Sequence, residues 1–203
     1  MSPLLNAAAL HKGALVKLEP AGRSTAFVFQ YNPEKLVRQL GPGIAGEELR
    51  LSFDLDAADA LERGDPQARE LGLLPALAAL HLLLMPRPAA DKEVAAGTAG
   101  TGLGASAEAQ AAPGAGRPAL IFAWGPHRQA PVRVVDCSIT EEAFDAALQP
   151  IRARVDLTLR VLSAQECAPD DPAYGRCLAY WKDLERLAGQ YRPERDLGYP
   201  LKF

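Results

Sequence analysis

Residues that could carry acid–base or metal chemistry are scattered through this chain of 203 residues. The three histidines, His11, His81 and His127, stand apart from one another, and no Ser or Cys lies in a nucleophile-elbow motif. His81 has no ligand-type partner three or four residues away, where a helix would present a metal pair. We therefore expect no catalytic residue, no cofactor and no metal site, and predict that the chain is not an enzyme. An enzyme of an unrecognised family stays open as an alternative, because catalytic triads assemble in space.

Two further patterns resemble ligand sites only in part. Asp54, Asp56 and Asp59 look like half a calcium loop, but the glycine and the distal glutamate are out of register, so we interpret them as solvent-facing charges. Gly100–Gly104 resembles a fragment of a nucleotide loop but lacks the preceding strand and the Lys-Ser/Thr pair. It lies in the segment 87–118, which is rich in Ala, Gly, Thr and Ser. Such a segment cannot bury enough apolar surface to order itself, so we expect a flexible insertion.

Composition narrows the class of protein. The net charge of −3 gives no basic face for nucleic acid, and there is no run of about 20 apolar residues to span a membrane. The first residues lack the basic and long apolar regions of a signal peptide, so we expect assembly in the cytoplasm. Cys137, Cys167 and Cys177 form no CxxC pair and are odd in number, which favours reduced thiols.

The stretch Thr25–Leu36 has the pattern of a strand with one aromatic face. Phe27, Phe29 and Tyr31 alternate with smaller or polar residues, and the run stops at Asn32-Pro33. Proline removes an N–H and fixes φ, so the chain must leave the ladder at this corner. We interpret the aromatics as core residues and the corner as a fixed hinge.

About six strands are expected in all. The others are predicted at Ala14–Glu19, Glu48–Asp56, Ala119–Gly125, Val132–Ile139 and Ile151–Leu162. In the strand Val132–Ile139, the more apolar face consists of Val135, Cys137 and Ile139, and Glu141–Gln149 is interpreted as a turn or a short excursion. In the strand Ile151–Leu162, the residues predicted to face outward are Arg152, Arg154, Asp156, Thr158 and Arg160. These patterns indicate a mainly β (α+β), mostly antiparallel fold, either closed into a barrel or covered.

Helices are expected in two places. Asp65-Pro66 opens one or two short helices, the better one over residues 74–84, and Asp171-Pro172 opens a C-terminal helix that ends near Gly189. Along that helix Tyr174, Cys177 or Leu178, Trp181, Leu184 and Ala188 recur at helical spacing. We divide the chain into an N-terminal arm (1–11), a β domain (12–168, with the 87–118 insertion) and a C-terminal helix with a docking tail (169–203).

The order of these segments resembles the tube-type proteins of contractile injection systems, which are phage-tail-like particles. The resemblance covers residues 12–165 outside the insertion. It rests on the following segments and residues: Lys12–Leu15, Phe27–Leu36, Leu49–Asp56, Pro118–Gly125, Val134, Ser138, Phe144 and Pro150–Leu159.

The resemblance implies an antiparallel tube-like β-barrel that assembles into a hexameric ring. It implies a structural baseplate subunit, the tube initiator, that joins the trimeric spike protein to the inner-tube protein and contacts baseplate wedge proteins. An inner-tube or tail-terminal ring subunit of the same machine is the alternative. Related members often carry a peptidoglycan-binding LysM module, and no such signature follows residue 165 here, which argues against cell-wall binding.

The resemblance assigns a set of structural residues, and the patterns of the last strand, the C-terminal helix and the tail supply candidates for an interface. The family-motif residues are Phe27, Phe29, Tyr31, Asn32, Pro33, Phe122, Trp124 and Gly125. The candidate ring or partner interface comprises Arg152, Arg154, Arg160, Tyr174, Trp181, Tyr199 and Phe203. A ligand- or glycan-binding β-barrel stays open as an alternative of another class, with Phe29, Tyr31 and Trp124 as a stacking surface.

Overall fold

The computed structural model describes residues 11–18, 24–41, 46–85, 119–167, 171 and 173–192. Within them, seven strands form one antiparallel sheet in the order β2-β1-β5-β6-β7-β4-β3. The strands are β1 Ala14–Leu18, β2 Ser24–Val28, β3 Leu36–Leu40, β4 Glu47–Asp56, β5 Ala119–Ala123, β6 Gln129–Phe144 and β7 Pro150–Val161. The predicted mainly β, antiparallel class is confirmed, and the sheet is not closed, because β2 and β3 are its two ends.

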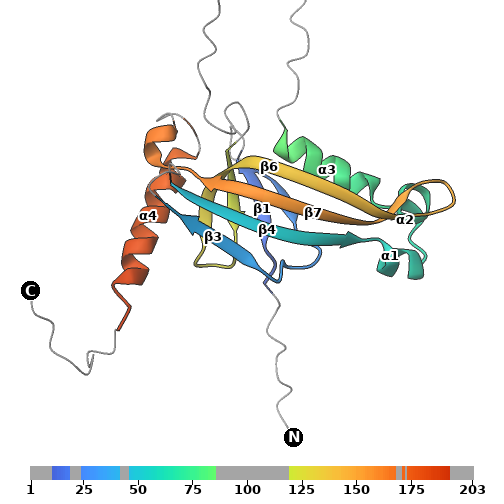
Figure 1. Cartoon of the computed structure of the whole chain (residues 1–203), viewed down its shortest axis with the longest axis horizontal. Coiled ribbons are helices and arrows are strands. Elements are labelled where there is room, and N and C mark those ends of the chain that lie inside the picture. The colour runs from blue at the N-terminus through green and yellow to red at the C-terminus, as the bar shows by residue number, and fades with distance from the viewer. Residues whose placement is uncertain are drawn as a thin grey trace, which may run out of the picture.

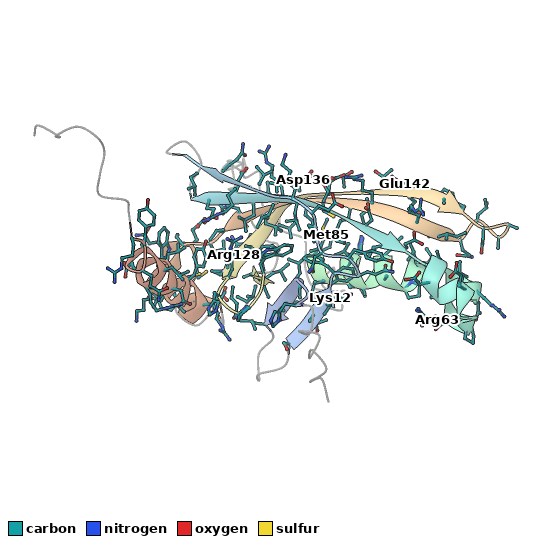
Figure 2. All side chains as sticks on the ribbon, turned by 90° about the horizontal axis from the view of Figure 1, so that it is seen from below. Lys12, Arg63, Met85, Arg128, Asp136 and Glu142 are labelled. Carbon is teal, nitrogen blue, oxygen red and sulfur yellow. The ribbon has the colours of Figure 1, made fainter. Side chains whose placement is uncertain are left out.

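The sheet folds over so that its two halves face each other across the core. Figure 2 shows β1 and β2 below the layer formed by β3, β4, β6 and β7. The rings of Phe29, just after β2, and Phe53 of β4 lie 4.7 Å apart between their centroids. Contact between residues from these two parts of the sheet shows that one core lies between them.

Apolar and polar residues alternate strictly along β4 and β7, and the apolar side chains of both strands form one side of this core. Leu49, Leu51, Phe53 and Leu55 of β4 are buried, and they lie opposite Leu159, Leu157, Val155 and Ala153 of β7. Burying a side chain of this size stabilises a fold by about 1.5–3 kcal/mol. A one-residue slip would turn the whole set to solvent, so burial fixes the register.

The described part of the connection from β4 to β5 holds three helices: α1 Ala58–Glu62, α2 Pro66–Leu71 and α3 Leu74–Leu84. The prediction of a helix over 74–84 is confirmed. Asp65 caps α2, since its Oδ1 accepts the Ala68 N–H at 3.0 Å. Between α2 and α3, the Leu73 N–H donates to the Pro150 carbonyl at 2.8 Å and joins the helices to β7. Helix α3 packs against β2 and lies on the same side of β6 and β7 as β1 and β2 (Figure 2).

The C-terminal helix α4 (Tyr174–Ala188) lies at one end of the sheet (Figure 1). It follows a short 3-10 turn, η2 (Ala164–Glu166), and ends with Gly189 at the C-cap, as predicted. A second, smaller core of Leu162, Cys167, Ala173 and Cys177 lies where β7, η2 and α4 meet. The opposite end of the sheet carries the β6–β7 hairpin, beside α1 and α2 (Figure 1).

Two strand predictions were wrong. The six-strand count missed β3, whose residues Leu36–Leu40 do not alternate and are half-buried or exposed. Strand β6 continues past Ile139 to Phe144, and a bulge between Val134 and Asp136 shifts its register. Before the bulge Val132 and Val134 are buried, whereas after it Ile139, opposite Val155 of β7, is 36% exposed.

Several predicted segments lie wholly or almost wholly outside the described residues: the arm 1–11, the insertion 87–118 and the tail after residue 192. Tyr199 and Phe203 fall in that tail. The division of the chain into these parts therefore stays a prediction.

Candidate assembly interface

Four aromatic residues of the family motif form the centre of the core. Phe29 and Phe122 are fully buried, and Phe27 and Trp124 pack partly buried against the same cluster. Trp124 stacks on Phe122, with ring centroids 5.6 Å apart and planes at 18°. The prediction that Phe27 and Phe29 belong to the core is confirmed, and Phe122 and Trp124 pack in the same core. Phe29 is therefore not available as a stacking platform.

A corner after β2 ties three parts of the sheet together. The Asn32 side chain accepts the Gly13 N–H and donates to the His11 carbonyl, both at 2.8 Å. The Gln30 amide donates to the Asp56 carbonyl at 2.7 Å and accepts the Asp56 N–H at 3.0 Å. Gln30 thus satisfies both backbone groups of Asp56, as a neighbouring strand would. The corner fixes the beginning of β1 and the end of β4 without any group suited to chemistry.

The prediction that Tyr31 belongs to the core was wrong, because 47% of this residue is exposed. The ladder of β2 ends at Val28, so alternation no longer decides which way a side chain three residues later points. Its hydroxyl donates to Asp59 Oδ2 at 3.4 Å. The Asp59 carboxylate, helped by burial and Asp56, raises the pKa of Tyr31 above its usual value.

The side chains of β4 and β7 that point away from the core form a charged surface, here called the outer face. It comprises Arg50, Ser52, Asp54, Asp56, Arg152, Arg154, Asp156 and Thr158. Cross-strand neighbours on this face pair with complementary polar groups: Arg152 bridges to Asp56 at 3.0 Å, and the Ser52 hydroxyl donates to the Asp156 carboxylate. Arg154 lies opposite Asp54 in register, is exposed, and has no ion-pair partner among the described residues.

An open hollow of about 710 Å³ lies on this outer face. Its lining includes the corner segment Tyr31–Lys35 together with charged residues of both signs, among them Arg50, Asp54, Asp136 and Arg154. A hollow with mixed charges and an open mouth suits a polar protein surface better than a small apolar ligand, whose sites are enclosed and mainly apolar.

The prediction that Arg160 faces outward at an interface was also wrong. Only 5% of this residue is exposed. Its Nη2 pairs with Glu166 Oε1 at 2.7 Å, because the η2 turn brings that carboxylate to it. The arginine therefore belongs to an internal ion pair and is removed from the candidate interface.

Helix α4 is held to the sheet through a buried carboxylate that sequence reasoning missed. Glu47, 8% exposed, accepts the Tyr180 hydroxyl at 2.8 Å and bonds the Arg38 Nε at 2.5 Å. Burial, then the hydrogen bond to Glu47, raises the pKa of Tyr180 to about 12. The signal was the spacing of Cys177, Tyr180 and Leu184, which fits one helix face as well as the predicted stripe did.

The predicted partner residues of α4 differ in exposure. Trp181 is 54% exposed, and Leu178 beside it is 42% exposed, whereas Tyr174 packs partly buried against the second core. Arg152 and Arg154 are exposed on the outer face. The structure therefore places the available candidates on two separate surfaces, the outer face and α4.

Comparison with known proteins adds no relative: no protein family and no curated protein matches this chain. Over the described ranges, no group of three or more His, Cys, Asp or Glu side chains is placed to hold a metal ion. None of the helices in these ranges has the length and apolarity needed to cross a bilayer.

Proposed function

We propose that this chain is a structural ring subunit of a contractile injection system, acting as the tube initiator between spike and inner tube. The observation that carries the proposal is an antiparallel sheet with a free edge strand at each end, β2 and β3, among the described residues. The resemblance in the order of the strand motifs is the second observation that supports the proposal. An inner-tube or tail-terminal ring of the same machine is the alternative within this class.

The β2 edge is suited to pairing with another chain. Natural edge strands are usually blocked by lysine, proline or a bulge, and the sequence Ser-Thr-Ala-Phe-Val of β2 has none of these. The Phe29 N–H donates to the Gly13 carbonyl, so the odd-numbered residues of this strand bond to β1. The backbone groups of Ala26 and Val28 therefore point toward the free edge.

Pairing of β2 in one copy with β3 in the next is head-to-tail. Such a contact uses two different surfaces, and it closes into a ring when the rotation between copies divides a full turn. Each copy would then extend the sheet of its neighbour into a continuous layer without edges. The charged outer face and α4 remain free in that arrangement to contact the spike, the inner tube or wedge proteins.

The test blocks the β2 edge while leaving the fold intact. Ala26→Pro removes an N–H that points outward, so the pairing with β1 keeps its hydrogen bonds. We expect the wild type to form rings, alone or with spike and tube proteins, in negative-stain images and light-scattering masses, and Ala26→Pro to stay monomeric. Ala26→Val keeps the N–H and is the matched control. A wild type that stays monomeric even with those partners would contradict the proposal.

The glycan-binding alternative keeps little of its predicted surface. Phe29 is buried and Trp124 is stacked on Phe122, which leaves Tyr31 as the exposed member of the three. A glycan titration that quenches Trp124 fluorescence would favour this alternative over the ring.

A further inference from the structure

Two of the three cysteines meet where α4 joins the sheet. Cys167 follows the η2 turn, Cys177 lies on α4, and their sulfur atoms are 3.4 Å apart. A disulfide needs these atoms at about 2.05 Å, so a displacement of little more than an ångström would bring them to bonding distance. Cys137, the third, lies on β6 and is outside this contact.

The surroundings of Cys167 and Cys177 do not fit a structural zinc site, the commonest other role of paired thiols. Cys167 is 6% exposed and Cys177 is fully buried, within the apolar cluster that includes Leu162 and Ala173. A structural zinc site takes four Cys or His ligands, and no third ligand stands with these two among the described residues. The contact is thus a dithiol pair without a metal shell.

We propose that Cys167 and Cys177 form a redox clasp, a reversible disulfide that ties α4 to the end of β7. Cys167, the more exposed thiol, attacks a low-molecular-weight disulfide such as oxidised glutathione and releases one glutathione thiolate. Cys177 then attacks the Cys167 sulfur of the mixed disulfide, forms the internal bond and releases the second glutathione. Two electrons pass to glutathione, and the two thiol protons leave to solvent or to the released thiolates.

The position of the clasp decides what it would do. The bond would close a loop of about ten residues between η2 and the first turns of α4, which restricts the unfolded chain and resists detachment of the helix. Tyr180, whose hydroxyl bonds Glu47, lies three residues after Cys177 on the same face. Helix α4 would then have a covalent anchor at its beginning and a hydrogen-bonded anchor one turn later. This effect does not depend on the ring proposal.

The same burial predicts slow closure. Burial, followed by the hydrogen bond and charge of Cys167, raises the pKa of Cys177 to about 12. Burial still raises this pKa once Cys167 is in the mixed disulfide, so few Cys177 thiols are ionised near neutral pH and the second exchange step is slow. The clasp would therefore respond to sustained oxidation and not to a brief change in redox state.

The experiment treats the full chain with millimolar oxidised glutathione, counts free thiols under denaturing conditions and maps the linked peptides by mass spectrometry. We expect the count to fall from the three cysteines of the sequence to one, with Cys167 linked to Cys177 and Cys137 still a reduced thiol. Reversal by a dithiol reductant is expected, and the oxidised protein should melt higher by about 5 °C or more.

Matched variants separate the pair from the third cysteine. Cys137→Ser should lose both remaining thiols, whereas Cys167→Ser and Cys177→Ser should form no internal disulfide. The peptide map of the wild type decides the question even where a variant fails to fold. Thiols of residues 167 and 177 that stay free throughout, or links that involve Cys137 instead, would overturn the proposal.

Discussion

At the scale of single residues, Gly13 sets the tightest packing constraint in the aromatic core. A Cβ at this position would lie 2.7 Å from Trp124 Cε3 and 2.8 Å from Phe29 Cδ2, closer than side chains normally approach. We expect Gly13→Ala to push both rings aside and to lower the free energy of unfolding by about 1–3 kcal/mol. Urea denaturation followed by tryptophan fluorescence measures this loss.

Gly41→Ala is the matched control for that change. No heavy atom of the described residues lies within 4 Å of the Cβ it would add, and the backbone there needs no positive φ. Its effect is expected to stay within about 0.5 kcal/mol. Equal losses in the two variants would show that the aromatic cluster tolerates an added methyl group at Gly13.

Alternation of apolar and polar residues predicts which side chains are buried only under two conditions. The chain must pair as a strand there, and no segment distant in sequence may cover the outward side chains. Phe29 lies one residue past β2, but its N–H still bonds the Gly13 carbonyl as a strand residue would, and its predicted burial is confirmed. Tyr31 fails the first, because β2 ends three residues earlier. Arg160 fails the second, because the η2 turn covers a side chain that a local pattern places in solvent. Both errors come from tertiary contacts that no local pattern contains.

At the scale of elements, the attachment of α4 depends on one buried carboxylate and one phenol. We expect Tyr180→Phe to cost about 1–3 kcal/mol at neutral pH, since it removes the donor to a buried Glu47. Tyr191→Phe is the control, because Tyr191 is 73% exposed and should change nothing. Urea denaturation at pH 7 measures both.

The pH dependence of that contact has a definite sign. The folded pKa of Tyr180, about 12, lies above the usual value near 10, so folding favours the neutral phenol. Its stabilisation is complete below pH about 10 and is lost as the pH rises through 12. The stability difference between wild type and Tyr180→Phe should therefore shrink over this interval. A constant difference up to pH 12 would mean that the phenol is not tied to Glu47.

The elements themselves were partly predictable. Strict alternation marked β4 and β7, and proline at the first turn marked α3, so these were predicted near their observed bounds. Strand β3 was missed because its Leu-Val-Arg-Gln-Leu sequence has no period of two, and it is a strand only through pairing with β4. The bulge in β6 was missed because a register shift depends on the partner strand.

At the scale of the whole molecule, the surfaces lie in a fixed arrangement. Strands β2 and β3 end the sheet, α4 lies at one end of the molecule, and the β6–β7 hairpin extends from the other (Figure 1). Non-closure of the sheet had no signal in the sequence. At the end of β4, the Gln30 side chain and not a further strand bonds both backbone groups of Asp56.

A final prediction concerns the outer face as a surface that binds a partner. Arg154 is exposed and without an ion-pair partner among the described residues, so reversing its charge should lower the free energy of unfolding by about 1 kcal/mol or less, through repulsion with Asp54 opposite. If the outer face meets the spike or inner tube, Arg154→Glu should weaken capture of that partner about tenfold or more at low salt. The effect should shrink at high salt, where charges separated by more than a few ångströms are screened.

Arg63→Glu is the matched control, since it makes the same change of charge at the C-cap of α1. Figure 2 shows Arg63 below the strands, on the opposite side from Asp136, which lines the hollow of the outer face. Pull-down of the spike and inner-tube proteins by each variant, at two salt concentrations, separates the two surfaces. If both variants capture the partners as the wild type does, the outer face is solvent-facing in the assembly, and α4 with the exposed Trp181 becomes the surface to test.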